Sequence, residues 1–74
     1  MADLVIDARN LPCPEPVIKV DREANGIGAG RTIEVIATDR GAIVDIPAWA
    51  MDRGYALAEE FEQDGEFHFI IKTR

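Results

Sequence analysis

The sequence predicts an α/β protein, a two-layer α+β sandwich in which a four-stranded mixed sheet is covered on one face by two helices. Three observations predict it. Apolar residues switch between strand-like and helical spacing in the order β-α-β-α-β-β. Asp64-Gly65 between the last two strand-like runs is typical of a hairpin. The 74 residues contain no repeat, linker or low-complexity segment, so we expect residues 1–74 to form a single domain.

The first half of the chain supplies a strand, a helix and a second strand. Residues 3–8 hold a continuous apolar run, typical of a strand covered on both faces or at its edge. From Pro16 the apolar residues recur at helical intervals until Asn25-Gly26, a combination that ends helices. Residues 32–37 are rich in β-branched side chains and predict the clearest strand.

Pro47 complicates the second helix, because proline in a helix interior costs about 3 kcal/mol. We therefore expect Asp45 to cap this helix and Pro47 to lie in its first turn. Residues 42–44 would then form a short separate turn, and Gly54 would follow the helix end.

The last third of the chain predicts two strands, over 55–61 and 67–72, where apolar and polar residues alternate. Right-handed crossovers make the first three strands parallel, and the hairpin makes the last antiparallel to the third. Trp49 is expected either in the core or at the sheet edge beside Cys13. Three further aromatic residues are expected to anchor the core: Phe61, Phe67 and Phe69.

Composition limits the setting and the partners. With 47% hydrophobic and 30% charged residues, the chain has the composition of an ordinary globular protein. A single cysteine excludes an internal disulfide, and no apolar stretch approaches the ~20 residues of a membrane span, so we expect a cytoplasmic protein without a membrane partner. Fourteen acidic against eight basic residues give a net charge of −6, which disfavours nucleic acid as a partner.

Cys13 is the candidate for chemistry, because the run 11–16 (LPCPEP) places it between the first strand and the first helix. Pro14 steers its neighbour toward an extended conformation, so we expect Cys13 to cap the helix. A helix N-terminus stabilises a thiolate, and Arg9 and Lys19 would offset the acidic residue between the prolines. The pKa of Cys13 is therefore expected below the ~8.5 of a free cysteine.

Other chemistries lack their residues. Cys13 and His68 are the only cysteine and histidine, too few for a structural zinc site, and His68 is expected to face solvent. There is no Cys-x-x-Cys pair and no glycine-rich phosphate loop. We therefore expect no metal and no cofactor. The acidic run 59–64 is expected to be a solvated strand end.

Four segments together resemble the TusA/SirA/YedF family of small sulfur carriers: 11–16 with its Cys-Pro-x-Pro element, 36–39 (IATD), 45–49 (DIPAW) and 67–72 (FHFIIK). The resemblance spans essentially the whole chain and implies a two-layer α/β sandwich. It also implies a sulfurtransferase-type relay in which Cys13 carries sulfur as a persulfide. The donor would be a cysteine desulfurase or rhodanese-like protein, and the acceptor a thiol protein.

Within that hypothesis, residues around Cys13 assist it. Pro14, Glu15 and Pro16 would present the sulfur by fixing the helix start. Three arginines would bind acidic partner groups or hold the persulfide as an anion: Arg9, Arg40 and Arg53.

The chain departs from the family pattern at three positions. Ala50 stands where many members have a second cysteine, which removes a resolving thiol from the same chain. Arg40 stands where many have proline, and Asn10 where many have glycine, although asparagine tolerates positive φ.

A rival interpretation comes from a different class of protein. It is a non-enzymatic regulatory or protein-binding module in which Cys13 is only structural. Fast alkylation of the native thiol would favour the relay, and reaction only after unfolding would favour the module.

Overall fold

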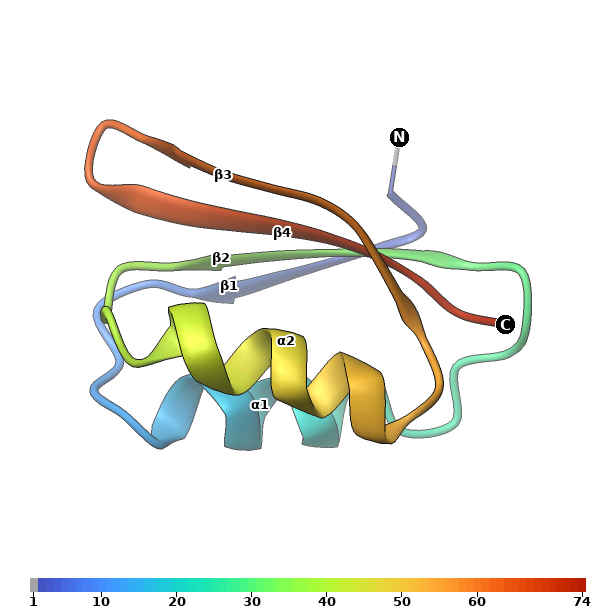
Figure 1. Cartoon of the computed structure of the whole chain (residues 1–74). Coiled ribbons are helices and arrows are strands. Elements are labelled where there is room, and N and C mark those ends of the chain that lie inside the picture. Colours follow the sequence, from blue (N-terminus) through green and yellow to red (C-terminus); the bar gives the residue numbers. More distant parts are fainter. Residues whose placement is uncertain (1) are drawn as a thin grey trace.

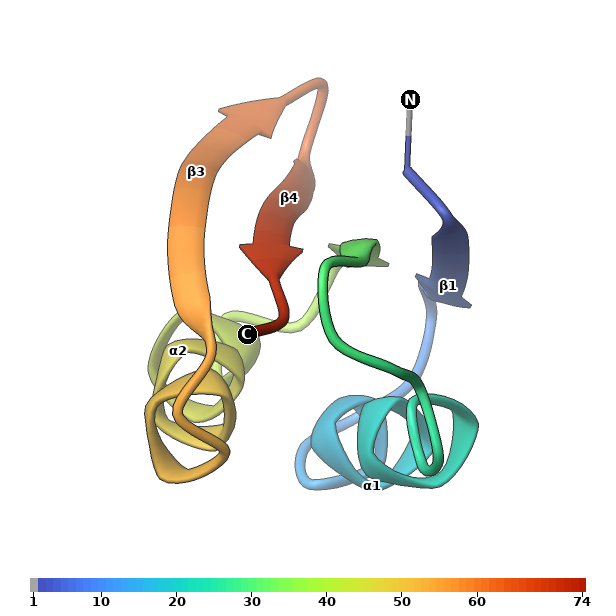
Figure 2. The ribbon, with the colours of Figure 1, turned by 90° about the vertical axis from the view of Figure 1, so that its right-hand side faces the viewer.

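The computed structural model describes residues 2–74, and its helices and strands alternate as the hydrophobic spacing predicts (Figure 1). The elements are β1 (Leu4–Ala8), α1 (Glu15–Glu23), β2 (Thr32–Ala37), α2 (Ala42–Asp52), β3 (Ala56–Gln63) and β4 (Glu66–Lys72). The strands form one sheet in the order β1-β2-β4-β3, with β1 and β2 parallel and β4 antiparallel to both its neighbours. Both helices lie side by side on one face of it (Figure 2). The predicted mixed sheet of β-α-β-α-β-β order is confirmed.

Alternation along the strands builds the core, because every second side chain faces the helices. Trp49 lies in this core, only 8% exposed, and its indole N–H donates a hydrogen bond of 2.9 Å to Asp21. Of the two expected positions, Trp49 therefore occupies the core and not the sheet edge beside Cys13. The sheet contributes these buried residues, which include two of the three predicted phenylalanine anchors: Ile6, Ala8, Ile33, Val35, Ala37, Phe67, Phe69 and Ile71.

The start of α2 differs from the expectation. The helix runs unbroken from Ala42, with Gly41 at the N-cap, so residues 42–44 belong to its first turn, and Asp45 lies in that turn rather than capping it. Pro47 lies inside the helix and lacks the N–H that would bond the carbonyl of Ile43. The buried face of α2 explains why the helix tolerates this loss, since tertiary packing supplies most helix stability in proteins.

β3 is an edge strand whose pairing with β4 shifts between Leu57 and Glu59. Such a shift moves the side chains beyond it to the other face. Phe61 therefore pairs with His68 on the outer face of the sheet, where the two rings stack at 4.7 Å and Phe61 is 38% exposed. The expectation that Phe61 anchors the core is wrong, because regular alternation ends at the bulge.

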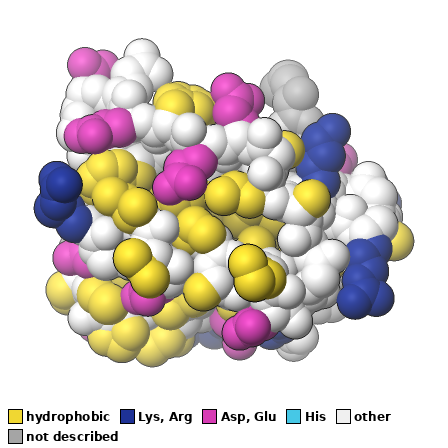
Figure 3. Space-filling model, in the orientation of Figure 1, with side chains coloured by type: hydrophobic (Ala, Val, Ile, Leu, Met, Phe, Trp, Pro, Cys, Tyr) yellow, Lys and Arg dark blue, Asp and Glu magenta, His cyan; other side chains and the backbone are white. Residues whose placement is uncertain are grey.

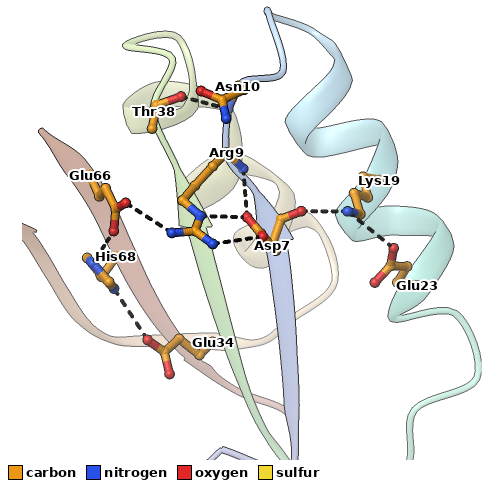
Figure 4. A network of polar contacts seen from close by, with 9 residues as sticks. All are labelled: Asp7, Arg9, Asn10, Lys19, Glu23, Glu34, Thr38, Glu66 and His68. Atoms are coloured by element: carbon orange, nitrogen blue, oxygen red, sulfur yellow. Dashed lines mark hydrogen bonds and ion pairs between the residues drawn. The ribbon is translucent and has the colours of Figure 1, made fainter.

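The outer face of the sheet carries a network of charged side chains (Figure 4). Arg9 donates hydrogen bonds to both carboxylate oxygens of Asp7 and to Glu66, which links β1 to β4. Those bonds lower the pKa of Asp7 to about 2. His68 lies on this face between Glu34 and Glu66, but its side chain is only 14% exposed, less than expected, because the ring of Phe61 stacks against it.

Candidate functional site at Cys13

The β1–α1 and β2–α2 connections meet at one end of the sheet, because parallel strands end at the same edge (Figure 1). Cys13 lies in the first connection and is exposed. The helix begins at Glu15 with Pro14 as its N-cap, so Cys13 lies one residue outside the cap and the prediction that it is the cap is wrong. The Cys13–Pro14 peptide bond is cis.

The second connection packs directly against Cys13. The thiol donates a hydrogen bond of 3.0 Å from Sγ to Oδ2 of Asp45, in the first half of α2. Gly41 comes so close that a Cβ at this position would lie 3.1 Å from Sγ and 2.8 Å from Oδ2 of Asp39. Asp39 in turn accepts a hydrogen bond of 2.8 Å from the N–H of Gly41. A glycine and two acids therefore form the wall beside the thiol.

This wall raises the pKa of Cys13 above its ordinary value. The main cause is the hydrogen bond to Asp45, followed by partial desolvation and by the charges of Asp45 and Asp39. The prediction of a lowered pKa is wrong. The two cations expected to compensate are engaged elsewhere, since Arg9 binds carboxylates on the outer face and Lys19 donates to the backbone carbonyl of β1 and pairs with a glutamate of α1 (Figure 4).

The three residues after Cys13 form the start of α1, with Pro14 as the N-cap and Pro16 in the first turn. Pro14 and Glu15 are exposed, whereas Pro16, the second residue of α1, is buried. The N–H of Glu15 donates a hydrogen bond of 2.8 Å to the carbonyl of Pro12. This turn encloses Cys13 between its two bonded ends and leaves the thiol on the surface.

The three candidate arginines are not brought together. Arg40 is exposed in the β2–α2 connection and is adjacent in the chain to Gly41, whose backbone lies against Cys13. Arg9 extends over the outer face of the sheet (Figure 4). Arg53 lies past the far end of α2, where it pairs with Asp21 and lies over the ring of Trp49 at 5.5 Å.

Sequence reasoning missed the acids and the glycine beside the thiol. The sequence predicts Asp45 as a helix cap and assigns a site role in the loop 39–41 only to Arg40, although both acids lie in segments that carry the family resemblance. One signal pointed to them: the carboxyl ends of two parallel strands lie at one edge, so the segments after β1 and β2 must be neighbours. Within residues 2–74 no three His, Cys, Asp or Glu side chains are grouped closely enough to hold a metal ion.

The fold and its exposed cysteine define a small two-layer α/β protein with a surface thiol, and comparisons identify its family. Residues 4–73 match the family described as sulfurtransferase TusA. The chain is 40% identical over 70 residues to the sulfur carrier protein TusA of Allochromatium vinosum, covering 95% of this chain and 92% of that protein. A 38% identical segment makes up 39% of the longer Bacillus subtilis protein YrkF and aligns with 96% of this chain.

Solved structures agree with this assignment. The crystal structure of a SirA-like protein from Desulfitobacterium hafniense superposes with a TM-score of 0.80 at 28% identity, covering 92% of this chain and 93% of that one. The chain therefore belongs to the TusA family of sulfur carriers, as its motifs indicated.

Proposed function

We propose that Cys13 is the residue on which this member of the sulfurtransferase TusA family carries sulfur, as a persulfide. The observation that supports this is the exposure of the chain's single cysteine where two helix starts meet. A non-enzymatic module with a structural cysteine would need a buried Cys13. The exposed thiol disfavours that alternative.

In the proposed loading step, Sγ of Cys13 attacks the outer sulfur of a donor persulfide. A sulfur–sulfur bond to Cys13 forms while the donor's sulfur–sulfur bond breaks, and the thiol proton passes to the leaving donor thiolate. A donor persulfide and a thiol thus become a donor thiol and a Cys13 persulfide, without net oxidation. Delivery to an acceptor thiol is the same exchange in the opposite direction.

The neighbours of Cys13 take supporting roles in this proposal. Pro14, Glu15 and Pro16 fix the start of α1 and so the direction in which sulfur is presented. In this proposal Arg40, which is exposed in the β2–α2 connection, binds an acidic group of a docked partner or the anionic persulfide. Arg9 and Arg53 lie away from the thiol and would act only on a partner that covers more than this end of the molecule.

Partners supply the specificity in this proposal, because a chain of 74 residues is too small to enclose a substrate around an exposed thiol. The donor is a cysteine desulfurase or a rhodanese-like protein, and the acceptor is a protein thiol. We place the exchange in the cytoplasm, where thiols are kept reduced. None of the helices described between residues 2 and 74 is long and apolar enough to cross a membrane.

Loading by a persulfide donor tests the proposal directly. Incubation with a cysteine desulfurase and cysteine, or with a loaded rhodanese, should add one sulfur atom to the intact mass, and reductant should remove it. Because the chain has no second cysteine to displace the sulfur as an internal disulfide, the loaded protein should be isolable.

The matched control is Cys13→Ser, which should never gain the sulfur. An unchanged wild-type mass with several donors of both kinds, while the thiol alkylates freely, would contradict the proposal and favour the binding module.

A further inference from the structure

Asp45 lies in the first turn of α2, where a negative charge favours the helix dipole, but that position does not require its carboxylate to face the thiol. It does not cap α2, whose N-cap is Gly41 without a side-chain hydrogen bond. Among residues 2–74 it takes part in no salt bridge, and the hydrogen bond its carboxylate accepts comes from Cys13 at 3.0 Å. The carboxylate is therefore committed to the thiol.

We infer that Asp45 is a positioning residue for sulfur transfer: it holds the proton and the direction of the unloaded Cys13 thiol and so favours the unloaded carrier over the loaded one. The inference rests on the proposed function, because the loaded form is the Cys13 persulfide.

The reason lies in what loading does to the hydrogen bond. Before loading, Sγ carries the proton that Oδ2 of Asp45 accepts. After loading, Sγ is bonded to a second sulfur and has no proton, so its lone pairs face the carboxylate. The outer sulfur lies about 2.05 Å farther on and carries the proton or a negative charge. Loading therefore removes the hydrogen bond from Sγ to Asp45 and sets the lone pairs of Sγ against the carboxylate. When the sulfur leaves, the hydrogen bond forms again and the repulsion ends.

Other charged groups around Cys13 do not duplicate this effect. Asp39, in the β2–α2 connection, adds a charge of the same sign, but its Oδ2 is engaged with the N–H of Gly41. Glu15 is exposed at the start of α1, and Arg40 is the cation of the β2–α2 connection. Only Asp45 accepts the thiol's hydrogen bond among the residues described.

The first test is the pH dependence of Cys13 alkylation by iodoacetamide in Asp45→Asn, with Asp52→Asn as the matched control. Asp52 lies exposed at the C-terminal end of the same helix, and its replacement by Asn removes the same charge. Half-maximal alkylation should move to lower pH in Asp45→Asn and stay at the wild-type value in Asp52→Asn. Thermal melts of both variants check that they fold, and Asp45→Ala should repeat the shift seen in Asp45→Asn.

The second test is the exchange equilibrium with cysteine persulfide, which needs no docking partner. Cys13 thiol and cysteine persulfide give Cys13 persulfide and cysteine, and intact mass measures the loaded fraction. At equal reagent concentrations, the ratio of loaded to unloaded protein should be several-fold higher in Asp45→Asn than in wild type and in Asp52→Asn.

The outcomes separate the two proposals. Alkylation profiles of Asp45→Asn that superpose on wild type overturn the role of Asp45, and so do loaded ratios that are measurable and equal in all three proteins. A shifted alkylation profile without loading of any variant supports the hold of Asp45 on the proton and overturns the proposed function instead.

Discussion

Two opposing influences act on the Cys13 thiol. A helix N-terminus favours the thiolate by about 0.3–1 kcal/mol, and that effect decays within the first turn. Cys13 lies outside the cap of α1, whereas its thiol donates a hydrogen bond directly to Asp45. The second influence prevails, and the pKa of Cys13 is raised. The free carrier is therefore mostly a protonated thiol at neutral pH, which slows reaction with oxidants because the thiolate is the reactive form.

A second residue-scale effect concerns the outer face. Arg9 lowers the pKa of Asp7 to about 2 from an ordinary value of 3.8, so the folded state binds this proton more weakly than the unfolded state does. Its stabilising contribution is therefore complete above about pH 4 and largely lost near pH 2. In thermal melts from pH 6 to pH 2, the difference between wild type and Asp7→Asn should shrink over that interval.

The shift in melting temperature should be small at every pH, because solvent screens the attraction of an exposed ion pair. Asp52→Asn, which removes an exposed charge from the helix side, should show no such narrowing. A constant difference between wild type and Asp7→Asn down to pH 2 would contradict the assignment.

At the scale of elements, the β3–β4 hairpin has one inward-facing and one outward-facing phenylalanine, and replacing them should change the free energy of unfolding by very different amounts. Phe69 is fully buried on the face of β4 that the helices cover, so Phe69→Ala should cost about 3–5 kcal/mol of unfolding free energy. Phe61 is partly exposed beyond the bulge, so Phe61→Ala should cost under about 1.5 kcal/mol, near the value of its stacking on His68. Denaturant melts measure both, and equal costs would place Phe61 in the core.

The sequence predicted the elements better than their junctions. Hydrophobic spacing and Asp64-Gly65 were sufficient for the strands, helices and hairpin, since these signals are local. The bulge near Glu59 depends on how β4 pairs, which periodicity within β3 does not record. The helix through Pro47 depends on packing that outweighs a local penalty.

The site was predicted in part for the same reason. Cys13 stood out because its flanking prolines are adjacent in the sequence. Its contact with Asp45 joins residues 32 positions apart, and only the assembled sheet edge brings them together. The rise in the pKa of Cys13 results mainly from that contact, so local sequence features could not predict it.

The surface of the whole molecule is divided by chemical character. Hydrophobic side chains gather over α2 and between α2 and β3 (Figure 3), where a shallow groove is lined mainly by Pro47, Met51, Tyr55 and Leu57. The opposite face of the sheet carries the charged network of Arg9 and His68. The β3 edge between these faces is acidic and exposed.

Those acidic residues should keep β3 from pairing with a second chain, because charges on an edge strand oppose the approach of another edge. Replacing Glu59, Glu60 and Glu62 together by Gln should increase self-association, measured by light scattering across a concentration series. The same triple replacement should leave the alkylation rate of Cys13 unchanged. A variant that stays as dispersed as the wild type at all concentrations would show that the charges do not guard the edge.

The directions of β1 and β4 determine where a further domain can be attached to this fold. β1 begins and β4 ends at the end of the sheet opposite to the Cys13 connection (Figure 1). Further polypeptide can therefore be attached before β1 or after β4 without crossing the thiol. The longer YrkF protein, of which the matching segment is 39%, shows that the fold occurs within larger chains. An added domain on such a tether would raise the local concentration of whatever it binds while the thiol surface stays open.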